Sequence, residues 1–456
     1  ETPDDIAAIA DQLAWIPTPP PKALDPFLLH FLEVGQGVRA ALNATSSYRR
    51  MELIERPIHR LEQLRTGLTA ESPLIATTYG EVVDRWLRIL ETAHRTLEEQ
   101  AQASREVPQV YLPGPPLDPE TAGDRFKGRV DLFREIETLV LSDQRPVLLL
   151  YGGRRTGKTS ALKYLPRCIG PEVLPLLVDC QAIAQATTLV GLADELAEQI
   201  VKSARRARNF NLPYPDRYAL RQDPFIALQR WMDKVENAVG DRTLLLCLDE
   251  FERLNEVVQA TGSRVPLNFL RHVMQHRPRW TLLFSGSHLL DELPPYWSDY
   301  LINTRSLRVS YLSEEDARAL IRQPVEDFPE IYDDEAVEAI IHLTRGQPYL
   351  IQLACYELVE RLNREGRRWV EREDVEAVVP VLFERGQMYF WEFWNLSLTP
   401  EQREVLRALV QGGEVREEMK AVADRLVVKE VLDRADDTYR FQVPLIRRWV
   451  EQKVGI

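Results

Sequence analysis

The sequence predicts a multidomain chain built around an α/β core, in which helices cover both faces of a parallel sheet. Between residues 126 and 310, short apolar runs alternate with helical patterns, as strands buried on both faces require. Helical patterns without such runs precede and follow this region. The 456 residues are also enough for roughly three domains of ordinary size.

Four near-continuous apolar runs are the expected strands of the core. Each is shorter than a typical helix and is followed by a segment that contains polar residues or glycine. The runs are Val147–Leu150, Val173–Val178, Leu244–Leu248 and Trp280–Phe284.

Two regions precede the core. Residues 1–105 have helical periodicity, and residues 106–125 form a linker whose prolines interrupt any helix. The clearest helical period runs from residue 79 to 100, with an apolar face that must pack against a neighbour. We place on that face Val82, Trp86, Ile89, Leu90, Ala93 and Leu97.

Two further regions follow the core. Residues 311–388 are helical, with Ser313 and Asp316 as candidate caps of the first helix. Residues 389–456 resemble a winged helix, with a first helix capped by Thr399 and a wing strand in "TYRFQVP". The aromatic segment Tyr389–Leu396 is either an exposed binding patch or a wedge between two domains, and we favour the wedge.

Composition limits the function classes. The net charge of −13 disfavours a general attraction to nucleic acid or anionic lipid. From residue 397 onward, eleven Lys or Arg balance eleven Asp or Glu, so the winged-helix region lacks the basic excess of a DNA-binding surface. No apolar run is long enough to span a membrane. Because the chain begins at Glu1, we expect a cytoplasmic protein that is either processed or part of a longer chain, in which an effector or membrane segment would precede it.

The stretch "GGRRTGKT" satisfies the pattern G-x-x-x-x-G-K-[ST] through Gly152, Gly157, Lys158 and Thr159. An apolar strand precedes it and a helical pattern follows, so a phosphate-binding loop is favoured over an ordinary strand–helix turn. Backbone N–H groups of such a loop surround phosphate oxygens, Lys158 reaches the β- and γ-phosphates, and Thr159 holds Mg²⁺. The other loop residues expected at the nucleotide are Gly153, Arg154, Arg155, Thr156 and Ser160. The two arginines contact nucleotide or a neighbouring domain, unless they are simply solvated.

The strand "TLLLCLDE" ends in Asp249 and Glu250. Acids at strand ends are often solvated, but downstream of a phosphate loop they form a Walker B arrangement. Asp249 would hold Mg²⁺, and Glu250 would polarise the attacking water; Glu250 and Lys158 are therefore the candidate catalytic residues. The next strand ends in Ser285 and Ser287, and a hydroxyl there is either a γ-phosphate sensor or an ordinary strand ending. We place Ser285 at the nucleotide and leave the sensing serine open.

From about Tyr111 onward, these motifs resemble the STAND class of P-loop ATPases within the AAA+ lineage. The resemblance implies ATP or ADP with Mg²⁺, a helical lid and a C-terminal winged helix. It implies adenine contacts for Phe126, Gly128 and Arg129 of "FKGR", and for Gly346 and Pro348 of "RGQP". A second-sensor arginine and a clear arginine finger are missing, which puts ring assembly in doubt. The finger candidates are Arg264, Arg271 and Arg305.

The resemblance implies a slowly hydrolysing ATPase that acts as a nucleotide-dependent switch, with a protein partner and possible oligomerisation on activation. The first alternative is a DNA-handling AAA+ ATPase of the origin-recognition or transposition-regulator type, which the charge balance disfavours. The second is a scaffold that keeps its nucleotide, which the intact motifs disfavour. The expected switch uses residues 1–105 to couple the nucleotide site to an output.

Overall fold

The structure, a computed structural model, describes residues 2–16, 26–44, 47–68, 73–103, 106–287, 292–301, 303–436 and 438–454. By internal contacts the chain forms two units. The first contains Glu1–Gln109 and Leu358–Val370, and the second contains Val110–Glu357 and Glu371–Ile456. None of the described helices combines the length and hydropathy needed to cross a bilayer. The division into five regions stays a prediction.

The first unit is helical, as predicted for the N-terminal region. It contains α1 (Pro3–Gln12), α2 (Pro26–Leu42), α3 (Ser47–Leu68) and α4 (Pro73–Ala103). The buried face of α4 differs from the predicted one at its start, because Val83 and Leu87 are buried while Val82 is exposed. Leu90 is buried as predicted, and Trp86 packs edge-on against Phe31 of α2. The apolar face therefore serves the packing of this bundle.

The second unit contains the predicted parallel sheet. In the part of the chain that the structure describes, five strands form it in the order β2-β3-β4-β1-β5, and every neighbouring pair is parallel. The strands are β1 (Val147–Tyr151), β2 (Val173–Asp179), β3 (Thr243–Asp249), β4 (Trp280–Gly286) and β5 (Thr304–Arg308). The first four confirm the predicted runs. Strand β5 is missing from the prediction because this edge strand, "TRSLR", buries only Leu307 and so has no apolar run.

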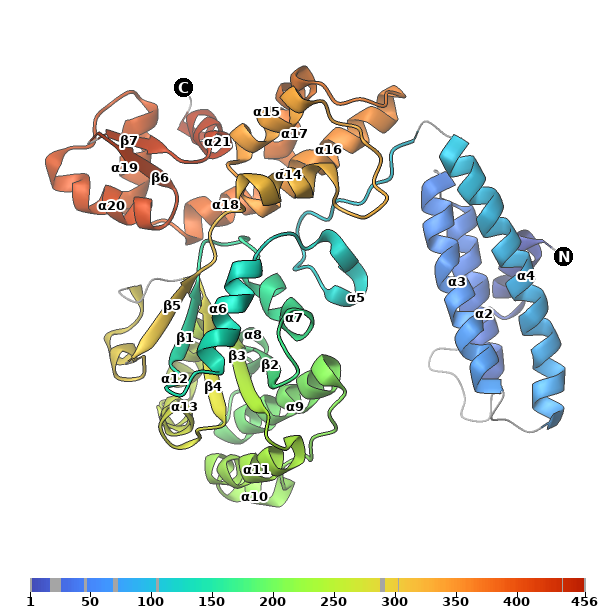
Figure 1. Ribbon diagram of the computed structural model, residues 1–456, viewed down its shortest axis with the longest axis horizontal. Coiled ribbons are helices and arrows are strands. Elements are labelled where there is room, and N and C mark those ends of the chain that lie inside the picture. The colour runs from blue at the N-terminus through green and yellow to red at the C-terminus, as the bar shows by residue number, and fades with distance from the viewer. Residues whose placement is uncertain are drawn as a thin grey trace. The chain divides into compact units, whose positions relative to one another are not determined.

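Helices cover both faces of the sheet (Figure 1). Leu148 and Leu150 of β1 pack in a core with α6 (Val130–Val140) and α7 (Lys158–Cys168). Leu149, which points the other way, packs in a core with α9 (Leu189–Arg208), α11 (Pro224–Val239) and α13 (Val265–His276). The α/β core of the prediction is confirmed. The shorter helices of this unit are α5 (Pro119–Ala122), α8 (Cys180–Ile183), α10 (Arg217–Gln222) and α12 (Leu254–Thr261).

Helices and a β-hairpin follow the sheet. The predicted lid contains α14 (Glu314–Arg322), α15 (Asp334–Thr344), α16 (Pro348–Glu365) and α17 (Arg372–Arg385), which we call the lid helices. Helix α18 (Gln387–Leu396) leads to the segment predicted as a winged helix, which contains α19 (Pro400–Val410), α20 (Lys420–Val428), β6 (Leu432–Ala435), β7 (Thr438–Phe441) and α21 (Pro444–Val454). Ser313 and Thr399 are caps as predicted, since their hydroxyls accept hydrogen bonds from the N–H groups of Asp316 and Gln402. Asp316, the other candidate cap, lies instead in the first turn of α14.

The aromatic segment Tyr389–Leu396 lies within α18 and acts as a wedge. Phe390 stacks on Trp449 of α21 with ring centroids 5.3 Å apart, and Tyr389 contacts Tyr349 of α16 at 4.9 Å. Trp391 is about half exposed. The segment therefore packs between α16 and α21, which is the kind of contact that the predicted wedge requires.

Candidate functional site

The loop between β1 and α7 has the backbone geometry of an anion-binding loop. Gly157 immediately precedes α7. Its φ of 95° is a value that L-residues rarely adopt. A Cβ on Gly152 would lie 2.3 Å from the carbonyl oxygen of Val309, so only glycine fits where the loop passes β5. The N-terminus of α7 therefore opens toward the loop and offers free backbone N–H groups to an anion.

Lys158 already lies over this loop. Its Nζ donates hydrogen bonds to the carbonyl oxygens of Gly152 at 2.9 Å and Gly153 at 2.7 Å. Burial lowers the pKa of Lys158 to about 8, although the nearby Asp249 and Glu252 act in the opposite direction. An anion in the loop would offset the cost of burying this charge, which is the electrostatic condition of a phosphate site.

The predicted metal-binding pair comes together. The Thr159 hydroxyl donates to Oδ2 of Asp249 at 2.7 Å, and the Ser285 hydroxyl donates to Oδ1 of the same carboxylate at 2.7 Å. Asp249 and Ser285 are register partners at the ends of β3 and β4. Hydroxyl and carboxylate oxygens suit Mg²⁺, which is usually held by few protein ligands together with substrate phosphates. Thr159 and Asp249 therefore fit the predicted ion.

Glu250 follows β3 in a left-handed backbone conformation and lines a cavity that borders the phosphate loop. Its carboxylate is about half exposed, and Nε of Arg253 lies 3.7 Å from Oε2. Burial, followed by the charge of Asp249, raises the pKa of Glu250. A partly buried carboxylate with a raised pKa beside a phosphate loop has the position and basicity of a candidate general base.

Glu252 is a functional candidate that the sequence reasoning missed. It lines the cavity, and its Oε1 accepts hydrogen bonds from the Ser287 N–H at 3.1 Å and hydroxyl at 3.2 Å. Its place as the third acid of "LDEFE", directly after the predicted Walker B pair, is the sequence feature that could have indicated it. Ser287 thus lines the cavity, whereas Ser285 is fully buried, points to Asp249 and is not a lining residue.

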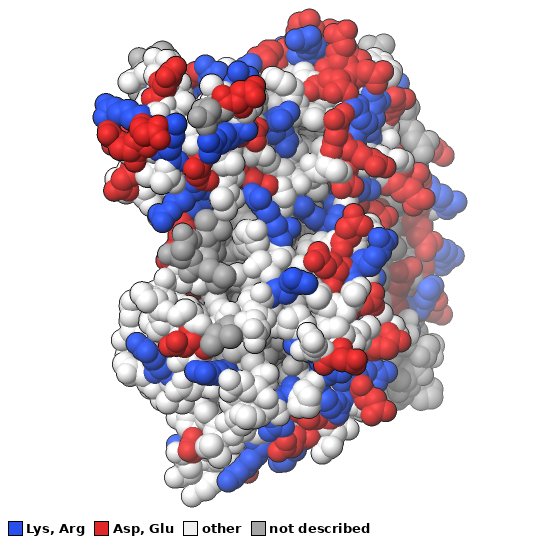
Figure 2. Space-filling model, turned by 60° about the vertical axis from the view of Figure 1, so that its left-hand side comes forward, with Lys and Arg blue, Asp and Glu red and all other residues white. Residues whose placement is uncertain are grey.

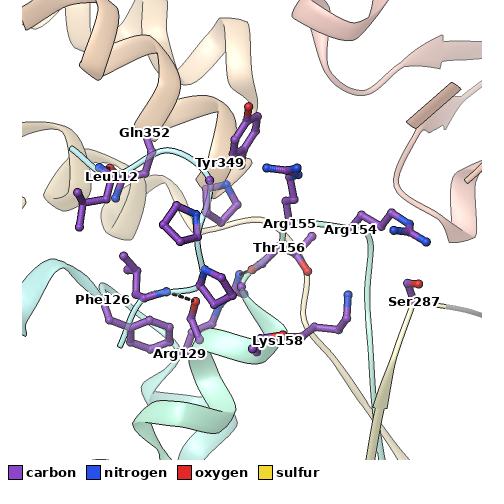
Figure 3. A pocket seen from close by; sticks show the side chains of 18 of the residues that line it. Leu112, Phe126, Arg129, Arg154, Arg155, Thr156, Lys158, Ser287, Tyr349 and Gln352 are labelled. Atoms are coloured by element: carbon purple, nitrogen blue, oxygen red, sulfur yellow. Dashed lines mark hydrogen bonds between the residues drawn. The ribbon is translucent and has the colours of Figure 1, made fainter. Parts of the chain in front are cut away.

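The cavity that these residues border has a volume of about 310 Å³. Leu112 and Phe126 lie on the side of it away from Lys158 and Ser287 (Figure 3), and we call this side the apolar end. A ligand cavity of this size typically combines apolar walls with a few polar groups. Of the predicted adenine-contacting residues, Phe126, Arg129 and Pro348 line it. Gly128 instead faces Asp316 of α14, and Gly346 packs against Leu312.

Phe126 and Arg129 are held by different contacts. The Phe126 ring stacks on Tyr164 of α7 with centroids 4.5 Å apart. Nη2 of Arg129 donates to the carbonyl oxygens of Thr156, at 3.1 Å, and Ser310. Arg129 therefore ties the phosphate loop to the segment that leads from β5 into the lid helices, and Phe126 forms part of the apolar wall.

The predicted linker also forms a wall of the cavity. We call residues 110–117 the strap; its Leu112, Gly114, Pro115, Pro116 and Leu117 are lining residues. The Leu112 N–H donates to Oε1 of the buried Gln352 at 2.9 Å, and the Leu117 N–H donates to the Ser160 hydroxyl at 3.0 Å. The strap is therefore fastened to a lid helix at one end and to α7 at the other.

The two loop arginines leave the loop in different directions (Figure 3). The Arg155 guanidinium lies 4.7 Å from the centroid of the Tyr349 ring, and its Nη2 lies 3.4 Å from Oε2 of Glu392. Arg154 lines both this cavity and a second one beside it. Arg155 therefore contacts neighbouring elements, which was one of the predicted alternatives.

The remaining candidates lie elsewhere. Gly152 and Gly153 line the second cavity. Arg264 stacks over Tyr296 with its guanidinium 4.6 Å from the ring centroid. Arg271 and Arg305 are exposed, and none of the three finger candidates is among the described residues that line the cavity at the phosphate loop.

No family model matches the chain, and no curated protein matches it in sequence. The structure is similar to that of the Walker-type ATPase PABY2304 of Pyrococcus abyssi, with a TM-score of 0.53 and 16% identity over 73% of this chain and 97% of that one. Two other structures are less similar. ORC2 of Aeropyrum pernix has a TM-score of 0.46 and 15% identity over 72% of this chain and 94% of that one. A RuvB protein of Thermotoga maritima has a TM-score of 0.40 and 12% identity over 73% of this chain and 96% of that one. At such identities the likeness establishes the fold alone, which this chain shares with that Walker-type ATPase.

Proposed function

We propose that the protein binds ATP and hydrolyses it slowly, and that the nucleotide sets the position of the lid helices and α18 relative to the sheet. The observation that carries this proposal is that residues of several elements line one cavity. Lys158 and Asp249 come from the α/β core, Tyr349 from a lid helix and Glu392 from α18. A ligand that contacts all of these elements can shift their equilibrium, because it binds one arrangement better than another.

The proposed chemistry follows from the positions of the side chains. Lys158 and the loop N–H groups bind the β- and γ-phosphates, and Thr159 with Asp249 holds Mg²⁺, which supplies charge neutralisation for phosphoryl transfer. Glu250 accepts a proton from the attacking water. The lining of the apolar end, with Phe126, Pro348 and the strap, suits an adenine ring.

The test is to measure the bound nucleotide and the phosphate release of the purified protein. We expect co-purifying ADP or ATP and a slow, Mg²⁺-dependent release of phosphate. Bound nucleotide without turnover would instead support the permanent scaffold. Protein that neither carries nor binds adenine nucleotide would end the proposal.

The resemblance to STAND proteins extends the proposal to signalling. In this view residues 1–105 couple the nucleotide state to an output through a protein partner. Deletion of these residues should then change nucleotide affinity or the output. If both stay as in the full chain, the bundle has a separate role.

A DNA-handling role is the second candidate, because the winged helix is a fold that often binds DNA. On the face that Figure 2 draws, Lys and Arg side chains are interspersed with Asp and Glu rather than grouped. Duplex binding at micromolar or lower Kd that weakens steeply with salt would favour this candidate. We expect weak binding or none.

A further inference from the structure

Arg155 joins the phosphate loop to two other elements. Its backbone has φ of 59°, and its carbonyl oxygen accepts a hydrogen bond from Nε2 of Gln347 at 3.3 Å. Its side chain lies over Tyr349 of α16 and forms an ion pair with Glu392 of α18. The left-handed conformation is unfavourable for arginine, so the contacts of both its backbone and its side chain hold it in place.

Glu392 lies at the phosphate end of the nucleotide cavity. A second cavity, of about 600 Å³, lies beside the first and is bordered by the loop, α18 and the winged helix. Among the described residues, those that line both cavities are Arg154, Thr156, Ser287 and Glu392. Arg154 and Thr156 belong to the phosphate loop and Ser287 follows β4, so the Glu392 carboxylate shares their end of the cavity.

A carboxylate in this position opposes the binding of phosphate. The side chains of Arg155 and Glu392 are only 27% and 23% exposed, so water screens their charges incompletely. While Arg155 is paired with Glu392, its positive charge is not fully available to a ligand. A triphosphate carries about one more negative charge than a diphosphate. Its binding beside the Glu392 carboxylate therefore costs more electrostatic free energy.

We propose that Glu392 is a specificity-determining residue that makes this conformation favour a nucleoside diphosphate over a triphosphate. A third phosphate competes with Glu392 for Arg155, so triphosphate binding weakens the contact between the loop and α18. A diphosphate leaves that contact intact. This inference rests on the proposed nucleotide binding and assigns its regulation to one ion pair.

The test compares the Kd for ADP with that for a non-hydrolysable ATP analogue, measured by calorimetry on the full chain with Mg²⁺. Glu392→Gln keeps the size of the side chain and its ability to accept a hydrogen bond from Arg155, but removes the charge. We expect the ratio of the analogue Kd to the ADP Kd to fall about fivefold in this variant. Arg155→Gln leaves Glu392 uncompensated and should raise the ratio. The double variant should return the ratio toward that of Glu392→Gln.

Glu376→Gln is the matched control, because Glu376 of α17 pairs with Arg448 of α21 at 2.6 Å and lines neither cavity. It should leave the ratio unchanged. Equal changes for both nucleotides in Glu392→Gln, or a change of the same size in the control, would overturn the inference and leave the proposed function standing. A wild-type chain that binds neither nucleotide would overturn both.

Discussion

The proposed phosphate end and the proposed base end of the cavity are built in different ways. At the phosphate end, polar side chains from two short motifs meet directly, as in the 2.7 Å contact between Thr159 and Asp249. At the base end, apolar side chains and backbone form the wall, and a contact such as that of Leu112 with Gln352 joins residues 240 positions apart. The phosphate end therefore requires particular residue types, whereas the base end requires only a cavity of suitable shape.

This difference also separates two tasks. The phosphate end carries the groups that bind the phosphates and take part in hydrolysis, and the strap and the lid helices at the base end carry the groups that bind the base. Variants at the two ends should consequently alter different measured quantities. Turnover and Mg²⁺ dependence should follow the phosphate end, and the affinity for the base should follow the other.

The largest effect is expected for Glu250→Gln at the phosphate end. The amide has nearly the same shape but cannot accept the proton, so phosphate release should fall about 100-fold or more. ATP affinity should change little, because the loop and Lys158 are intact. Single-turnover phosphate release beside equilibrium ATP binding checks this. An unchanged rate would remove Glu250 as the base and direct attention to Glu252, which lines the same cavity.

Lys158→Ala should have the next largest effect, on affinity. It removes the charged donor that lies over the loop, which corresponds to a loss of about 2 to 3 kcal/mol, or about 30- to 150-fold in Kd for ATP. Lys163→Ala is the control, since Lys163 lies on the same helix but pairs with Asp118 at 3.4 Å. Calorimetry with ATP measures both. An ATP affinity that survives the loss of Lys158 would contradict the phosphate assignment.

The two ends also differ in how much of their structure the sequence predicts. The four buried strands and the phosphate loop were predictable because burial on both faces and phosphate binding restrict residue type. Strand β5 was not, because an edge strand needs no apolar run. The strap lies within the predicted linker, and its position at the cavity is not predictable, since prolines indicate only the absence of a helix and carry no information on what the segment covers. The Arg155–Glu392 pair depends on a tertiary contact that no local pattern encodes.

At the base end, Gln352→Leu should have a smaller and more selective effect. The substitution removes the acceptor of the Leu112 N–H and loosens the strap, so ATP affinity should fall about five- to tenfold, as expected for one buried hydrogen bond. Inorganic tripolyphosphate, which has no base, should bind as tightly as to the wild type. Equal weakening of ATP and tripolyphosphate would show that the two ends do not act separately.

The smallest effect on ATP affinity is expected for Ser160→Ala. This variant is informative when it is compared with Thr159→Ala. These neighbouring hydroxyls serve opposite ends, because Thr159 donates to Asp249 whereas Ser160 accepts from the strap at Leu117. Ser160→Ala should weaken ATP about threefold, at the low end of the range for one hydrogen bond, and leave the Mg²⁺ concentration for half-maximal turnover unchanged. Thr159→Ala should raise that Mg²⁺ concentration instead. Titration of Mg²⁺ at saturating ATP separates the two, and equal Mg²⁺ dependence in both variants would mean that the ion does not distinguish these hydroxyls.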